Sequence, residues 1–239
     1  MSKRHPVVAV TGSSGAGTST VKRAFEHIFA REGITPAVVA GDSYHRSERM
    51  PMKQAMAEAL SAGQNFSHFG PEANLFDKLA ELFRTYGETG AGQKRYYLHS
   101  PEEATEHNAR LGVNLEPGQF TPWEDIPSGT DVLFYEGLHG GVQGEGYDVA
   151  GLADLLVGVV PITNLEWIQK IHRDNAERGY SAEAIVDTIL RRMPDYINHI
   201  CPQFSQTDIN FQRVPTIDTS NPFICRNIPT PDESFVIIH

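Results

Sequence analysis

Cysteines, basic residues and long apolar stretches are all scarce in this sequence. The two cysteines, Cys201 and Cys225, are too far apart to match a metal-binding spacing. The 30 acidic residues outnumber the 20 Lys and Arg and give a net charge of −10, which argues against a general nucleic-acid or anionic-membrane partner. No apolar run reaches the ~18 residues of a membrane span, and residues 1–6 carry no signal-peptide core. We therefore expect a cytoplasmic protein that binds neither nucleic acid nor membranes.

A glycine-rich turn between an expected strand and an expected helix is the strongest motif. Residues 7–11 are a short, mostly β-branched run, and residues 21–29 carry apolar side chains at helical spacing. Between them, Gly12 and Gly17 have the spacing of a phosphate-binding loop, in which backbone N–H groups and a helix N-terminus hold phosphate oxygens. The residues predicted to bind nucleotide phosphates are Gly12, Ser13, Ser14, Gly15, Ala16, Gly17, Thr18, Ser19 and Thr20.

This loop lacks the lysine that usually precedes its hydroxyl residue. Thr18 stands at that position, so the mobile cation for the transferred phosphate has to come from elsewhere in the chain. Ser19 follows and is predicted to offer its hydroxyl to Mg²⁺. The alternative is a strand–helix turn that binds nothing.

A second expected strand, residues 37–41, ends at Asp42. Ligands of open α/β sheets lie beyond the carboxyl ends of strands, so we expect Asp42 beside the glycine loop, with the two strands ending side by side. A simple capping role is the alternative. The residues that follow, His45, Arg46, Arg49 and Lys53, form a local basic cluster in an acidic protein. They suit either a phosphate group of the substrate or a solvated surface.

Two later segments add an acid and several cations. Residues 131–137 read as a buried strand that ends at Glu136, where P-loop enzymes place an acid for Mg²⁺. After another strand at 155–161, expected helices carry Lys170, Arg173, Asp174, Arg191 and Arg192, and we predict a break at Pro194. Such helices suit a lid that supplies the charge that Thr18 cannot.

The remaining pattern predicts one α/β domain over residues 1–239. Its fold class is a P-loop, nucleotide-kinase-like sheet, mostly parallel, flanked by helices and covered by a helical lid. We also expect a strand at 94–99, a turn at 100–103, and strands at 209–216 and 234–238. Because the last strand runs to His239, we expect the natural chain to continue beyond it.

Several motifs together resemble the bacterial phosphoribulokinase family, within the wider uridine kinase and phosphoribulokinase group. The matching segments cover nearly the whole chain and are residues 12–20, 41–45, 96–99, 135–141, 171–179 and 191–196. The plant type has a regulatory cysteine in the glycine loop, and this loop has none.

The resemblance implies MgATP-dependent phosphorylation of D-ribulose 5-phosphate at O1, the Calvin-cycle reaction that gives ribulose 1,5-bisphosphate. It also implies a homo-oligomer, an octamer in the bacterial type, that NADH activates and AMP inhibits. The implied residues are Asp42 as catalytic base, Lys170 at the ATP γ-phosphate, Asp174 as a second important carboxylate, Glu136 as the strand-end acid, His45, Arg49 and Arg173 at the sugar phosphate, and Arg192 in the allosteric response. Lys53 joins His45 and Arg49 in the cationic cluster that a phosphorylated acceptor needs.

Three other functions stay open at this point. One is a nucleoside or other small-molecule kinase of the same group; a phosphorylated acceptor needs the cationic cluster, and a nucleoside does not. A guanine-nucleotide switch needs an Asn-Lys-x-Asp segment, which is absent from the sequence. A non-catalytic nucleotide-binding module fits only if Thr18 disables phosphate transfer.

Overall fold

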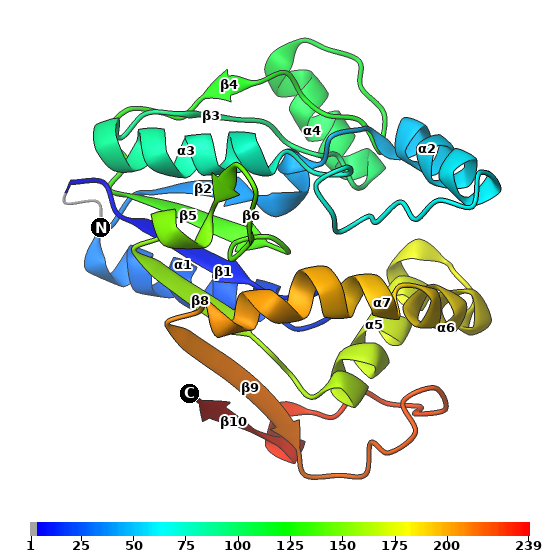
Figure 1. Ribbon diagram of the computed structural model, residues 1–239. Helices are drawn as coiled ribbons and strands as arrows, with labels where there is room; N and C mark the ends of the chain where they lie inside the picture. Colours follow the sequence, from blue (N-terminus) through cyan, green and yellow to red (C-terminus); the bar gives the residue numbers. More distant parts are fainter. Residues whose placement is uncertain (1–3) are drawn as a thin grey trace.

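A six-stranded sheet runs through the middle of the molecule, as Figure 1 shows for the computed structural model. The structure describes residues 4–239, apart from the side chains of residues 177 and 178. The strands lie in the order β10-β9-β8-β1-β5-β2, and all neighbouring pairs are parallel except the antiparallel β9–β10 pair. Their bounds are β1 (Val7–Thr11), β2 (Pro36–Ala40), β5 (Val132–Gly137), β8 (Leu155–Val159), β9 (Ile209–Pro215) and β10 (Ser234–Ile238).

Helices cover both faces of this sheet, so the predicted P-loop type of α/β fold is confirmed. Side chains on β5 alternate between the faces: Phe134 packs on Phe25 of α1, with ring centroids 5.1 Å apart, and Tyr135 packs on Phe83 of α3 at 5.5 Å. The helix bounds are α1 (Thr18–Glu32), α2 (Arg49–Ser61), α3 (Phe76–Thr89), α4 (Pro101–Leu111), α5 (Thr163–Arg178), α6 (Ala182–Arg191) and α7 (Met193–Asp195).

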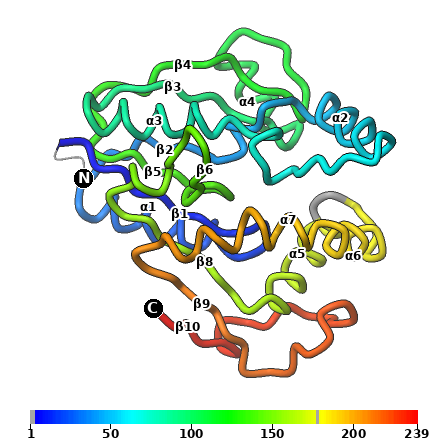
Figure 2. Tube along the Cα trace, in the orientation of Figure 1, coloured from blue at the N-terminus to red at the C-terminus, as the bar shows by residue number. Residues whose placement is uncertain are grey.

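The chain divides around the sheet. Figure 2 shows α2, α3 and α4, cyan to green, on the side of β2, and the yellow to red C-terminal part on the side of β8. Two short ribbons lie outside the main sheet, β3 (Gln93–Lys94) with β4 (Glu124–Asp125), and β6 (Gln143–Gly144) with β7 (Tyr147–Asp148). Within the described residues, no helix is long and apolar enough to cross a membrane.

The prediction that the first two strands end side by side is wrong. β5 lies between β1 and β2, so the glycine loop and Asp42 do not follow adjacent strands. Glu136 of β5 pairs with Val10 on one side and with Ala40 on the other. The strand-end acid therefore lies between the two segments that the sequence placed side by side.

Three local expectations are corrected by the structure. The strand predicted at 94–99 is regular only at β3, after which an isolated bridge joins Tyr97 to Phe120. The turn predicted at 100–103 is the start of α4, where the Ser100 hydroxyl accepts a hydrogen bond from the backbone N–H of Glu103. The break expected at Pro194 falls at Arg192 instead, because proline is tolerated in the first turn of the next helix, α7.

Candidate active site

The glycine loop curls between β1 and the N-terminus of α1. Gly15 and Gly17 have φ values of 103° and 101°, which side chains other than glycine rarely adopt. A Cβ on Gly15 would lie only 3.0 Å from the carbonyl oxygen of Glu166 and 3.2 Å from Cβ of Lys170. Helix α5 is therefore packed directly on the loop at Lys170, and only glycine leaves room for that approach.

A cavity of about 350 Å³ opens over this loop, and polar groups from three strand ends line it. Ser19 comes from the start of α1, Glu136 from the end of β5, and Asp42 from the helical turn (Gly41–Tyr44) after β2. The ends of β2 and β5 meet through two glycines, since a Cβ on Gly41 would lie 2.8 Å from Cα of Gly137. The absence of both side chains allows the Asp42 and Glu136 segments to lie against each other.

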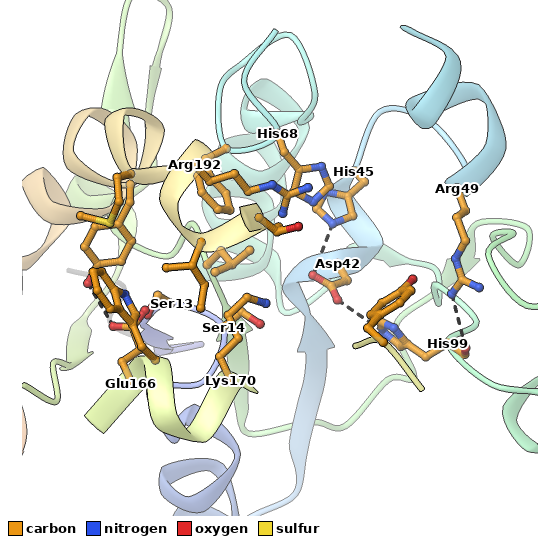
Figure 3. Close-up of a pocket in the computed structure, with 18 of the residues that line it drawn as sticks. Ser13, Ser14, Asp42, His45, Arg49, His68, His99, Glu166, Lys170 and Arg192 are labelled. Atoms are coloured by element: carbon orange, nitrogen blue, oxygen red, sulfur yellow. Dashed lines mark hydrogen bonds and ion pairs between the residues drawn. The ribbon is translucent and has the colours of Figure 1, made fainter. Parts of the chain in front are cut away.

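A second cavity of about 420 Å³ adjoins the first (Figure 3). Ser13, Ser14, Asp42, His99 and Leu138 line both cavities, so the two form one continuous cleft with Asp42 at the junction. The second cavity is rich in cationic and histidine side chains, which are Arg49, Lys170, Arg192, His45, His68 and His99.

Two imidazoles bracket the Asp42 carboxylate. His45 Nε2 lies 3.4 Å from Oδ1, and His99 Nε2 lies 3.3 Å from Oδ2. Burial raises the pKa of Asp42, but the hydrogen bond and charge of His45, with a smaller effect of His99, outweigh burial and lower the pKa below its ordinary value. The side chain keeps 38% of its surface accessible, so an ionised carboxylate faces the cleft.

Lys170 lies in a second charged cluster beside the glycine loop. Its Nζ is 2.7 Å from Oδ2 of the buried Asp174, and Arg173 binds Oδ1 of the same carboxylate at 2.8 Å. Arg173 also donates to the Ser14 hydroxyl at 2.8 Å. Burial raises the pKa of Asp174, but Lys170 and Arg173 together lower it below its ordinary value. Two cations therefore point at the loop from α5, held by one shared carboxylate.

The structure brings most predicted site residues to this cleft, with two differences in placement. Lys53 is exposed on α2 and lines neither cavity, because the helix turns its side chain to solvent. Arg173, expected at the sugar phosphate, lies against the glycine loop rather than beside Arg49. Arg49 itself donates to the Tyr97 hydroxyl at 3.3 Å and lines the second cavity.

A buried amide that sequence reasoning missed connects the strand end to the loop after β5. Gln203 accepts hydrogen bonds from the Thr11 hydroxyl and the Gly141 N–H, both at 3.0 Å. Its Nε2 donates to the carbonyls of Leu138, at 2.9 Å, and His199, at 2.8 Å. All of its polar atoms are satisfied, so it fixes the segment after Glu136 against β1.

Glu166 is a second buried group that the sequence did not single out. It lies in the first turn of α5, lines the second cavity, and accepts a hydrogen bond from the Tyr196 hydroxyl at 3.1 Å. Burial raises the pKa of Glu166. The hydrogen bond from Tyr196 and the charge of Lys170 lower it, but by less, so the pKa stays above its ordinary value. No sequence signal marks it, because an acid in the first turn of a helix usually faces solvent.

The fold and the cleft define a P-loop phosphotransferase. A sequence model described as the Phosphoribulokinase / Uridine kinase family matches residues 7–220. The chromosomal phosphoribulokinase of Cupriavidus necator is 62% identical over all of this chain and 80% of its own length. The phosphoribulokinase of Nitrobacter vulgaris is 58% identical over the same shares. A solved phosphoribulokinase structure from Rhodobacter spheroides has 55% identity and a TM-score of 0.85, covering 99% of this chain and 80% of that one. The chain thus belongs to the phosphoribulokinase and uridine kinase family and is a kinase.

Proposed function

We propose that this protein transfers the γ-phosphate of MgATP to O1 of D-ribulose 5-phosphate and releases ADP and ribulose 1,5-bisphosphate, in the cytoplasm and as a step of the Calvin cycle. The names of its relatives support this acceptor. The observation that carries it is the position of Asp42, an ionised carboxylate between a phosphate-binding loop and a cavity lined by Arg49 and His45. A nucleoside has no phosphate to engage such cations, whereas ribulose 5-phosphate does.

Each group that lines the cleft has its own role in the proposed reaction. The backbone N–H groups of the loop hold the ATP phosphates, and Lys170 balances the charge on the transferred group. Asp42 takes the proton of the O1 hydroxyl as its oxygen attacks the γ-phosphorus and the bond to the ADP oxygen breaks. Ser19 and Glu136 line the same cavity, and their hard oxygen atoms would hold Mg²⁺, which would neutralise charge on the ATP phosphates.

An ADP-release assay with several acceptors tests this function. We expect turnover with ribulose 5-phosphate to exceed that with unphosphorylated ribulose or uridine by well over tenfold, because only the first engages the cationic cavity. A preference for uridine would indicate that the protein is a nucleoside kinase of this family. Bound ATP without ADP release for any acceptor would instead indicate a non-catalytic nucleotide-binding module.

Arg49→Ala is expected to raise KM for ribulose 5-phosphate by roughly ten- to a hundredfold. This is the loss of affinity that corresponds to the free energy of one charge-assisted hydrogen bond. KM for ATP should change little, since Arg49 does not line the cavity over the glycine loop. Steady-state kinetics with each substrate varied in turn measure both constants, with Arg84→Ala on the outer surface of α3 as the control. Equal rises in both KM values would contradict an acceptor role for Arg49.

We further propose that NADH activates the enzyme, that AMP inhibits it and that it assembles into an octamer, with Arg192 in the response to NADH. The resemblance of residues 191–196 to the bacterial type supports this. Arg192 lines the second cavity, which we call the acceptor cavity because the sugar phosphate is proposed to bind there. Its guanidinium lies 5.8 Å from the Phe69 ring centroid. Arg192→Ala should weaken the response to NADH at sub-saturating ribulose 5-phosphate. An NADH titration of the full-length protein measures it, and a flat response in the unmodified enzyme would contradict the proposal.

A further inference from the structure

Asn74 is a buried side chain directly behind the acceptor cavity. It is 1% exposed, lies between α2 and α3, and forms an isolated β-bridge with His45. Its Nδ2 donates hydrogen bonds to two backbone carbonyls, His68 O at 3.0 Å and Gly70 O at 2.8 Å. A reversed amide would place its oxygen against both carbonyls, so these two bonds fix which end of the amide faces His45.

This fixed orientation decides where the His45 protons lie. Asn74 Oδ1 is 2.8 Å from His45 Nδ1 and is only an acceptor, so Nδ1 carries a proton. On the other side of the ring, Nε2 lies 3.4 Å from Oδ1 of Asp42. An aspartate with an ordinary pKa near 3.9 loses its proton to an imidazole with one near 6.5. Both ring nitrogens of His45 therefore face acceptors.

We propose that Asn74 holds His45 as a doubly protonated imidazolium, which gives the cavity a constant positive charge for the phosphate of the acceptor. Asn74 is thus a positioning residue that acts through His45. The proposal rests on the proposed function for the identity of that acceptor. The protonation of His45 does not depend on it.

The groups around His45 both raise and lower its pKa. Burial lowers the pKa of His45, but the hydrogen bonds that its ring donates to Asp42 and Asn74, with the negative charge of Asp42, outweigh burial and raise the pKa above its ordinary value. Arg95 opposes this with its charge, although its guanidinium donates to the His45 carbonyl at 2.7 Å. The ring of His68, 4.9 Å away, stays neutral, since burial and the charge of His45 lower its pKa to about 3.

Three other ionisable rings, those of His139, His99 and Tyr97, lie near His45 or its partner Asp42. His139 is buried, and this lowers its pKa to about 3, with the charge of His45 adding to the effect. His99 lies on the far oxygen of Asp42, and the Tyr97 ring is 6.1 Å from that of His45. The Asp42 carboxylate, the neutral rings of His68 and His139 and the Arg95 guanidinium thus lie around the imidazolium, and its charge faces the cleft, where an anion can bind.

Loss of the Asn74 acceptor should make acceptor binding sensitive to pH. In Asn74→Leu, Nδ1–H of His45 has no partner, which disfavours the charged form and lowers its pKa, so the charge is lost at a lower pH than in the unmodified enzyme. We expect the ratio of variant to unmodified KM for ribulose 5-phosphate to be smallest near pH 6 and to reach about tenfold by pH 8.5. KM for ATP and kcat should change little, because Asp42 stays ionised.

Two further variants separate charge from structure. In Asn74→Asp the carboxylate still accepts from Nδ1 but no longer donates to the two carbonyls, so a lower Tm should accompany an unchanged pH profile. Asn108 is the matched control: its amide bridges the N–H and carbonyl of Leu115 at 2.8 and 2.9 Å, outside both cavities. Asn108→Leu should lower Tm without altering the pH dependence of KM. An identical pH profile for folded Asn74→Leu and the unmodified enzyme would overturn the proposal.

The charge of His45 can also be read directly, without substrate and without a variant at Asn74. Nitrogen-15 NMR of the histidine rings, with the His45 signals assigned by their loss in His45→Gln, should show both nitrogens of His45 protonated at pH 7.5. A neutral tautomer at that pH would overturn the proposal, even if Asn74→Leu failed to fold. Failure of the proposed function would appear differently, as no ADP release with ribulose 5-phosphate and an unaltered NMR result.

Discussion

Replacing Asp42 with asparagine is expected to lower kcat by about 10²–10⁴, the usual value of general-base help. A sugar hydroxyl is a poor nucleophile until its proton is accepted, and an amide of the same shape cannot accept it. We assign this task to Asp42 because it lies where the cavity over the glycine loop and the acceptor cavity meet. The bracketing imidazoles of His45 and His99 keep it ionised and fix its orientation.

The affinity for MgATP should be nearly intact in Asp42→Asn. Ser19, Glu136 and the loop N–H groups are untouched, and loss of a carboxylate near phosphates removes repulsion. Steady-state kcat and calorimetric ATP binding on the same preparation measure the two quantities. Asp77→Asn, at an exposed acid in the first turn of α3, is the control. Near-normal turnover would remove Asp42 as the base, and collapsed ATP binding in a folded variant would make it a metal-site residue.

The sequence predicts best those parts of the molecule that depend on a few neighbouring residues. The glycine loop, the strand before it and the acid at the end of β5 are each set by a short pattern of apolar residues, glycines and one polar side chain. Helix α4 belongs to the same class, although the sequence pattern predicts a turn at its start. Ser100, Pro101 and Glu103 are the residues that begin a helix, and the Ser100 hydroxyl caps it.

The parts that depend on how distant segments meet could not be predicted. No local pattern places β5 between β1 and β2, or shows that Lys53 faces solvent on α2. Asn74 and Gln203 are ordinary polar residues in the sequence. Their importance comes from partners that are far away along the chain, as with Gln203 and Thr11, 192 residues apart.

We propose Lys170 as the cation that replaces the missing loop lysine, and its position in the structure supports this. The backbone of α5 packs on Gly15 of the loop at Lys170, so the base of this side chain is fixed beside the phosphate-binding N–H groups. Its ammonium group is held by Asp174, and Arg173 neutralises the same carboxylate from the other side. In this proposal the Lys170 ammonium group moves to the γ-phosphate, and Arg173 remains a partner of Asp174.

Lys170→Met should consequently lower kcat by roughly 10²–10³, the cost of removing one charge contact that is made mainly in the transition state. KM for ATP should rise much less, because the loop N–H groups bind the ground state. Single-turnover measurements isolate the chemical step. Lys22→Met is the matched control, since Lys22 forms the same i,i+4 pair with an acid on α1, at 3.9 Å from Glu26. A Tm close to that of the unmodified enzyme would show that Asp174 stays paired without Lys170. A kcat within about twofold of the unmodified value would show that another cation replaces the loop lysine, and Arg173, on the Ser14 hydroxyl, would be the next group to change.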